Sequence, residues 1–264
     1  MNQAYDISKG SPERFGFQWE TYNKILPIYE EQFKHWTILI DQKFWENKTF
    51  LDVGCGTGRN SYWPIKYGAS QGIAIDVNEK SLSSARNNLD SIHNKICIEK
   101  TSAYEIPYKD QFDIVFSIGV IHHLEFPETA LSKMVQAAKP GGKILIWVYG
   151  YENNEWIVKY FNPIRKLLFS KLPISIVHFI SIFPAMFLWI LIKLGFGKIG
   201  YFNLIRQFSL GHLRLVIFDQ MLPCIANYWT KAEVYNLMKN AGLQNILLKQ
   251  VNGMSWCALG TKVL

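Results

Sequence analysis

Short apolar runs alternate with helical stretches between residues 49 and 150. Five runs of four to six residues have the length and composition of strands that are buried on both faces. These runs are Phe50–Val53, Gly72–Asp76, Ile96–Glu99, Asp113–Ser117 and Lys143–Val148. Stretches such as Glu79–Ile92 and Glu128–Ala138, which have the pattern of helices, separate several of them. The alternation predicts βαβ units around a parallel sheet.

The end of the chain predicts a helix followed by a hairpin. Thr230-Lys231-Ala232-Glu233 has the form of a capping box, and Gly242 is placed to end the helix that follows it. Asn252-Gly253 then joins the apolar segments Asn245–Val251 and Ser255–Leu264, as in a β-hairpin. The expected fold class is α/β, doubly wound, with a mostly parallel seven-stranded sheet and a C-terminal antiparallel hairpin.

Residues 151–229 interrupt this rhythm with an aromatic and apolar stretch. The stretch holds eight Lys and Arg residues against three Asp and Glu, and so carries five of the seven net positive charges of the chain. We expect a helical insert after strand five that acts as a substrate lid. The predicted organisation is an N-terminal helical cap (1–48), a cofactor-binding α/β core (49–150), the insert (151–229), and the final helix and hairpin of the core (230–264).

A glycine-rich turn follows the first apolar run, at Leu51–Asn60. Its spacing is G-x-G-x-G, and Arg59 stands where nicotinamide-binding enzymes have their third glycine, which argues against an oxidoreductase. Glycines let the backbone approach a ligand closely, and the following helix start offers free N–H groups. Asp76 ends the second run, where a carboxylate can accept hydrogen bonds from ribose hydroxyls. The turn and Asp76 together predict a nucleoside-containing ligand.

Four motifs in this order resemble the class I S-adenosylmethionine-dependent methyltransferases, especially the group that includes quinone-biosynthesis enzymes. They are Leu51–Asn60, Gly72–Asp76, Phe112–Leu124 and Lys139–Ile146, and they cover about residues 48–150. The resemblance implies an enzyme that uses S-adenosyl-L-methionine as its cofactor.

The same resemblance implies which residues hold that cofactor. The first motif would surround the methionine part of the cofactor, and Asp76 would hold the ribose. The ends of the third and fourth strands would line the adenine and the path of the methyl group. Ser102 stands where the family often has an Asp, so the contact with the adenine amino group would be weaker. The expected cofactor-binding residues are Asp52, Gly54, Cys55, Gly56, Gly58, Asp76, Val77, Ser102, Ala103, Ser117, Ile118 and Gly119.

Methyl transfer requires alignment of the reacting atoms, and a hydroxyl acceptor also benefits from a base. His122 and His123 follow the fourth strand and Tyr149 follows the fifth, which makes them the catalytic candidates; packing against the cofactor or a helix is the alternative. Arg14–Trp19 resembles an N-terminal lid of some relatives, or else packs its aromatic side chains at a helix end. The candidate substrate-binding residues are Trp19, Tyr149, Asp219 and Tyr228.

The sequence excludes some classes of methyl acceptor but does not identify the acceptor. Ser117–Val120 lacks the Asn/Asp-Pro-Pro-aromatic motif of enzymes that methylate adenine or glutamine amino groups. We expect a small lipophilic or amphipathic acceptor, lipid-linked or free, with oxygen or carbon favoured. RNA methylation is an alternative, but nucleic acid is disfavoured because the basic residues lie in an apolar insert. A non-catalytic methyltransferase-fold adaptor at a membrane surface is another. No metal site is expected, since adjacent histidines rarely converge on one ion.

The insert contains a long uncharged segment, Leu172–Ile192, bracketed by Lys171 and Lys193. Its length would suit a membrane span, but the closing hairpin must return to the same sheet. A buried or interfacial segment is therefore expected, with peripheral membrane contact through residues 172–197 as one form of it. The four scattered cysteines and the polar first fifteen residues predict a cytoplasmic protein that associates with membranes if that contact exists. The oligomeric state is not indicated.

Overall fold

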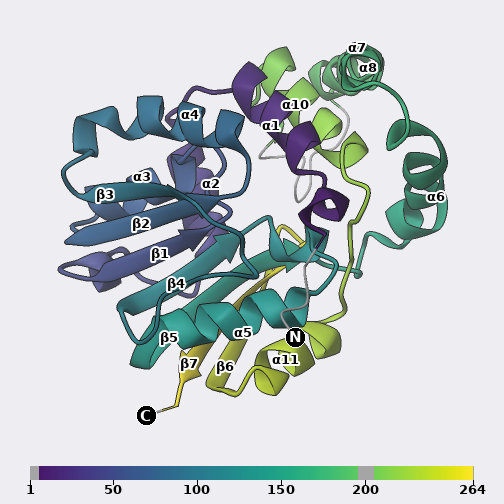
Figure 1. Cartoon of the computed structure of the whole chain (residues 1–264). Helices are drawn as coiled ribbons and strands as arrows, with labels where there is room; N and C mark the ends of the chain where they lie inside the picture. Colours follow the sequence, from purple (N-terminus) through teal and green to yellow (C-terminus); the bar gives the residue numbers. More distant parts are fainter. Residues whose placement is uncertain (1–5, 196–204, 264) are drawn as a thin grey trace.

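A seven-stranded sheet organises the chain in the computed structural model, which describes residues 6–195 and 205–263. The strand order is β3-β2-β1-β4-β5-β7-β6 (Figure 1). The first five strands are parallel, whereas β6 and β7 pair antiparallel at one edge. The strands are β1 (Thr49–Val53), β2 (Gln71–Asp76), β3 (Ile96–Lys100), β4 (Phe112–Ile118), β5 (Ala138–Tyr149), β6 (Leu243–Val251) and β7 (Ser255–Lys262). This confirms the expected doubly wound α/β fold with its C-terminal hairpin.

Two details differ from the sequence expectation. Ala138 already pairs with Phe112, so Lys139–Gly142 belongs to the start of β5 and is not a separate turn into it. The pairing between β4 and β5 shifts register between Phe112 and Ile114, which accommodates the extra residues of β5. The last strand ends at Lys262, and the expected end at Leu264 lies outside the described residues.

Helices cover both faces of the sheet. On one face, α5 (Pro127–Ala137) and α11 (Lys231–Asn240) pack against strand residues such as Leu51 and Val115. On the other face, α2 (Ile28–Trp36), α3 (Arg59–Lys66) and α4 (Glu79–Leu89) pack against Phe50 and Phe116. The α11 helix begins with the predicted capping box, in which Thr230 and Glu233 each bond the backbone of the other.

The N-terminal segment and the insert lie together at one end of the sheet, where α1, α7, α8 and α10 cluster (Figure 1). The N-terminal segment comprises η1 (Ile7–Gly10), α1 (Pro12–Thr21) and η2 (Gln42–Trp45) besides α2. The insert comprises η5 (Ile157–Phe161), α6 (Asn162–Ile164), η6 (Arg165–Phe169), α7 (Ile174–Ile180), α8 (Ile182–Lys193) and α10 (Leu210–Met221). Two further short turns are η3 (Asp90–Ile92) and η4 (Ile121–His123).

Arg14 fastens α1 to the insert. Its Nε donates to the carbonyl oxygen of Leu222 at 2.8 Å, and one terminal nitrogen donates to the carbonyl of Phe169 at 2.7 Å. The other terminal nitrogen donates to the carbonyls of Ser170 and Leu172. One guanidinium therefore satisfies four backbone oxygens from two separate segments of the insert.

The helical insert is unusually apolar on its outside. Ile174–Lys193 is, in the described part of the chain, a helical segment long and apolar enough to cross a bilayer, with a mean hydropathy of 2.2. Only 17% of its most apolar window is buried. Its inner side packs on α10, where Val177 contacts Phe218 and Ile192 contacts Leu213. The segment thus lies on the protein surface with most of its side chains uncovered.

We expect Arg14→Ala to loosen the junction between α1 and the insert and to lower the free energy of unfolding by about 2 kcal/mol, because four carbonyls lose a charged donor. Hydrogen exchange would increase in residues 12–21 and 165–172. Arg86→Ala is the matched control, since Arg86 is exposed and forms a surface ion pair with Glu79, so its loss should cost about 0.5 kcal/mol or less. Equal hydrogen exchange in both variants would contradict the role of Arg14 in joining α1 to the insert.

Candidate functional site

The turn between β1 and α3 is closed by bonds to the neighbouring strand β2. Gly54, Gly56 and Gly58 have φ angles of 79°, 54° and 76°, which favour glycine. The N–H groups of Gly54 and Cys55 both donate to the carbonyl oxygen of Ile75, at 2.8 and 2.9 Å. The N–H of Gly56 donates to Asp76 Oδ2 at 3.0 Å. These bonds fix the backbone of the turn at the carboxyl edge of the sheet.

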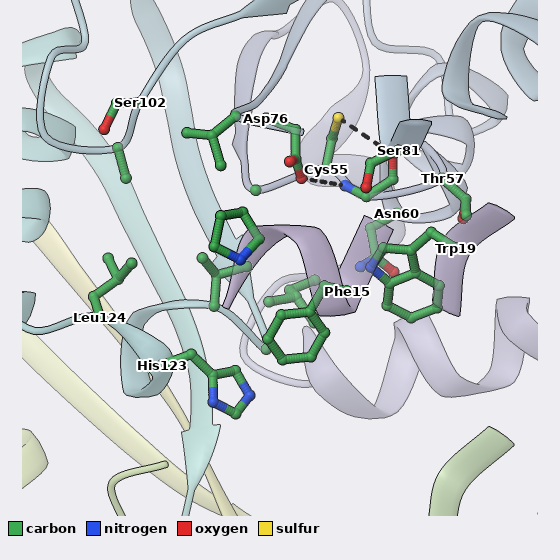
Figure 2. A pocket seen from close by; sticks show the side chains of 18 of the residues that line it. Phe15, Trp19, Cys55, Thr57, Asn60, Asp76, Ser81, Ser102, His123 and Leu124 are labelled. Atoms are coloured by element: carbon green, nitrogen blue, oxygen red, sulfur yellow. Dashed lines mark hydrogen bonds between the residues drawn. The ribbon is translucent and has the colours of Figure 1, made fainter. Parts of the chain in front are cut away.

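A cavity lies in front of this turn, and we call it the turn cavity (Figure 2). Residues that follow β1, β2, β3 and β4 line it from the sheet side, and Pro12, Phe15 and Trp19 of α1 line it from the opposite side. Nearly all of the predicted cofactor-binding residues are among its walls, namely Gly54, Cys55, Gly56, Asp76, Val77, Ser102, Ala103, Ile118 and Gly119. The structure thus brings these residues together in one place.

Asp76 lines the turn cavity directly beside the glycine turn. Its Oδ1 accepts from the N–H of Asn78 at 2.9 Å, while Oδ2 accepts from Gly56. Burial raises the pKa of Asp76, and these backbone donors oppose the shift. Each oxygen keeps further lone pairs, so the carboxylate can still receive two neighbouring hydroxyl groups.

Three predicted cofactor residues support the turn and do not line the cavity. Asp52 is buried and accepts from Ser61 Oγ at 2.6 Å; burial raises its pKa to about 7. Ser117 Oγ donates to the carbonyl of Val53, which ties β4 to β1. Gly58 caps α3 in a left-handed conformation. In the structure these three residues shape the turn, and their expected contacts with a cofactor stay a prediction.

The α1 helix covers the turn cavity. An atom placed as a Cβ on Gly56 would lie 3.2 Å from the indole Nε1 of Trp19, so the ring stands directly over the turn. The Phe15 ring lies 5.0 Å from that of His123 on the other side (Figure 2). The Arg14–Trp19 segment therefore occupies the place expected of a lid, and its rings also pack as expected of a helix end.

Ser102 lies at the rim of the turn cavity, away from Asp76 (Figure 2). Its Oγ accepts from the N–H of Tyr104 at 3.2 Å, which uses one of its two lone pairs. One lone pair is left for an amino group, a weaker acceptor than a carboxylate.

A second cavity adjoins the first, and we call it the aromatic cavity. Aromatic rings contribute to its walls, from Trp36, Trp147, Tyr149 and Tyr228. The two cavities share the walls Trp19, Arg59, Ile118, Gly119 and Asp219. A molecule in the aromatic cavity would therefore meet a molecule in the turn cavity along this common wall.

Asp219 and Tyr149 form the centre of a hydrogen-bond network there. Asp219 accepts from Gln18 Nε2 and from Tyr149 Oη, each at 3.0 Å. Tyr149 Oη also accepts from Gln220 Nε2 at 2.9 Å, and Gln220 Oε1 accepts from Tyr228 Oη. Burial, reinforced by the Asp219 charge, raises the pKa of Tyr149 well above its usual range. Tyr149 Oη thus donates to Asp219 and orients that carboxylate, and the catalytic role expected of Tyr149 stays a prediction.

The two adjacent histidines have different environments. His123 Nδ1 lies 2.7 Å from the carbonyl oxygen of Ile225, which can only accept, so Nδ1 carries the hydrogen and Nε2 keeps a lone pair. His123 lines the turn cavity. His122 is fully buried, lines neither cavity, and packs its ring 3.9 Å from that of Tyr149. In the structure His122 is thus a packing residue, and its catalytic role stays a prediction.

The sequence analysis missed several residues of the common wall and the aromatic cavity, namely Gln18, Gln32, Trp36, Arg59, Asn154, His212 and Gln220. Arg59 was noted only as the residue that replaces a glycine, and Gln18 only as part of the lid motif. The others carry no local signal, because they come from α2, α10 and a loop. Among the described residues no cluster of His, Cys, Asp and Glu could hold a metal ion.

Comparison with known proteins places this geometry in context. Residues 51–146 match the model of a methyltransferase domain. The chain is 29% identical over 128 residues to norajmaline N-methyltransferase of Rauvolfia serpentina, which covers 47% of this chain and 44% of that protein. It is 28% identical over 131 residues to tRNA U34 carboxymethyltransferase of Shewanella baltica, covering 43% of this chain and 40% of that protein. The chain thus spans less than half the length of these curated relatives.

Among solved structures, a SAM-dependent methyltransferase from Aquifex aeolicus superposes with a TM-score of 0.53 at 17% identity, over 98% of this chain and 100% of that one. The chain therefore shares the fold of solved S-adenosylmethionine-dependent methyltransferases, and residues 51–146 match a methyltransferase domain. The turn cavity has the features that S-adenosyl-L-methionine needs, since it offers a close backbone approach at Gly54–Gly56 and a half-buried carboxylate at Asp76.

Burial lowers the pKa of His123 to about 4, so the neutral ring prevails at neutral pH and protonates only as the pH falls through about 4. We expect its ring resonances in an NMR titration to stay constant from about pH 8 to 5 and to shift near 4. Assignment uses the His123→Gln variant, in which this signal is missing. A midpoint near the ordinary value of about 6.5 would contradict the burial argument.

Proposed function

We propose that the whole chain transfers a methyl group from S-adenosyl-L-methionine to a small amphipathic acceptor bound in the aromatic cavity. The observation that carries this proposal is the common wall: Ile118, Gly119 and Asp219 border both cavities, so cofactor and acceptor meet there. An oxygen acceptor is favoured, because Asp219 and the free lone pair of His123 both accept hydrogen bonds near that wall.

The chain supplies binding, orientation and exclusion of water, and the cofactor supplies an already activated methyl group. Asp76 and the Gly54–Gly56 backbone hold the nucleoside and methionine parts. Trp19 and Phe15 close the turn cavity from above, which keeps water from the reacting atoms. Tyr149 and Gln18 fix the Asp219 carboxylate, so that it orients the acceptor without having to move.

The aromatic walls and the exposed apolar insert further support an acceptor with a flat ring and an apolar chain. Such a molecule would place this protein in the quinone-biosynthesis-like group that the sequence motifs resemble. The ring would lie among Trp36, Trp147 and Tyr149, and its chain would leave past Ile157 and Leu215 of the insert.

RNA is the second candidate acceptor. The match to a tRNA-modifying enzyme and the positive charge of the insert favour it. The expectation from the sequence that the protein does not bind nucleic acid is therefore not supported. The aromatic walls would stack an unpaired base. Transfer of labelled methyl to total RNA, and not to lipid or metabolite extracts, would favour this candidate.

Binding of the demethylated cofactor S-adenosylhomocysteine, measured by calorimetry, tests the core of the proposal. We expect micromolar binding that weakens at least tenfold in Asp76→Ala, because the ribose loses a half-buried charged acceptor. Asp41→Ala is the control, since Asp41 is exposed at η2. Mass spectrometry of extracts incubated with the protein would then show an acceptor heavier by one methylene. Absent heat, or equal binding by both variants, would contradict the cofactor site.

The exposed face of the insert supports peripheral contact with a membrane, as part of a cytoplasmic protein. Residues 156–194 hold no Asp or Glu, and Lys159, Lys166, Lys171 and Lys193 are exposed beside the apolar side chains. Large apolar side chains are at least 44% exposed at twelve positions there, namely Trp156, Tyr160, Ile164, Leu167, Leu168, Ile176, Phe179, Phe183, Met186, Phe187, Ile190 and Leu194. Such an area is a surface for lipid or for a partner. Residues 196 and 197 of the expected contact lie outside the described chain.

We expect the protein to co-sediment with phosphatidylserine-containing vesicles and Phe183→Glu/Phe187→Glu to bind at least tenfold more weakly, because both rings are more than half exposed and would lose their insertion into lipid. Tyr235→Glu/Leu247→Glu, on α11 and β6, is the control for adding two charges at exposed apolar positions. Equal sedimentation of both double variants, or no sedimentation of the unaltered protein, would overturn the membrane contact.

A further inference from the structure

Arg59 is enclosed by aromatic rings and has no anionic partner among residues 6–195 and 205–263. Its guanidinium carbon lies 5.0 Å from a ring centroid of Trp19, 4.9 Å from that of Tyr29 and 5.3 Å from that of Trp36. No described side chain or carbonyl accepts a hydrogen bond from it. Such rings hold a cation in place but leave its N–H donors unused.

The position of Arg59 directs these donors toward the cavities. It is the first residue of α3, directly after the glycine turn, and it borders both the turn cavity and the aromatic cavity. Trp36 and His212, its neighbours on the far side, line only the aromatic cavity. Burial, with a contribution from the Arg59 charge, lowers the pKa of His212 to about 4, so that ring adds no second positive charge.

Other buried polar atoms lining the aromatic cavity also lack partners in the described structure. They include Oε1 of Gln18, Oε1 of Gln32, Oδ1 of Asn154 and Nε1 of Trp147. Gln18, Gln32 and Asn154 are each at least 93% buried, so water from the bulk does not satisfy them. Buried polar atoms are normally bonded, so these atoms indicate a polar ligand in the cavity. The three amide oxygens call for donors on that ligand, such as hydroxyl groups, and only Trp147 Nε1 can itself donate.

We propose that Arg59 binds a carboxylate or phosphate group of the acceptor, so that the substrate of this site is an acid. A guanidinium fork matches either group with two parallel hydrogen bonds, which a neutral acceptor cannot provide. Asp219 carries the opposite charge on the same common wall and repels that group, so the acid end lies at Arg59 and the other polar end near Asp219. This inference rests on the proposed function, because it assigns the aromatic cavity to the acceptor.

Binding of small ring acids to the protein loaded with S-adenosylhomocysteine tests the inference. The probes are benzoate and phenyl phosphate, with benzamide as their neutral counterpart, and dissociation constants come from calorimetry or saturation-transfer NMR. We expect at least one acid to bind tenfold or more tightly than benzamide, and the better acid shows whether carboxylate or phosphate is preferred. Arg59→Gln should abolish the preference, and Arg59→Lys should retain part of it, because it keeps the charge without the fork.

The affinity for S-adenosylhomocysteine separates this site from the cofactor site. Arg59→Gln should weaken the binding of the preferred acid at least fivefold more than that of S-adenosylhomocysteine, and Arg86→Gln, at an exposed arginine on α4, should change neither affinity. A preference that survives Arg59→Gln, or an unaltered protein that binds no acid better than benzamide, overturns the inference. A large loss of S-adenosylhomocysteine binding in Arg59→Gln does so too, since Arg59 would then hold the carboxylate of the cofactor. Failure of the unaltered protein to bind S-adenosylhomocysteine would instead refute the proposed function.

Discussion

The bond between the Gly56 N–H and the Asp76 carboxylate links the glycine turn to the second strand, and both cavities depend on it. Burial makes a charged Asp76 costly, and the N–H groups of Gly56 and Asn78 offset part of that cost. The same turn sets the start of α3 and therefore the direction of Arg59. This hydrogen bond thus fixes the Asp76 carboxylate on one side of the turn and the start of the helix that carries Arg59 on the other.

The roof of the site is assembled from segments that are remote in sequence. The α1 helix brings Gln18 and Trp19, while α10 brings Asp219 and Gln220. Two contacts join these segments: Arg14 donates to backbone carbonyls of the insert, and Gln18 donates to the Asp219 side chain.

The sheet and the turn were predictable because their signals are local. Strand runs, the capping box at Thr230 and the glycine spacing each lie within about ten residues, and their order in the chain follows the βαβ pattern. The aromatic cavity was not predictable, because Trp36, Asn154 and Gln220 acquire a role only when distant helices pack together.

His122 and His123 show that sequence cannot predict the environment of each residue even within a single motif. They are neighbours on one turn of η4, yet that turn directs one ring into the core and the other into the turn cavity. Periodicity does not distinguish them, since the difference is decided by Tyr149 on one side and by the Ile225 carbonyl on the other.

Asp219 is part of the insert and also a wall of the turn cavity. Exchanging the whole insert for that of a relative would therefore alter a wall of the turn cavity together with the aromatic cavity. Trp36 and Asn154 border the aromatic cavity and not the turn cavity. Under the proposed function, replacements at these two positions would change the choice of acceptor and leave the cofactor site intact, whereas exchange of the whole insert would weaken cofactor binding as well.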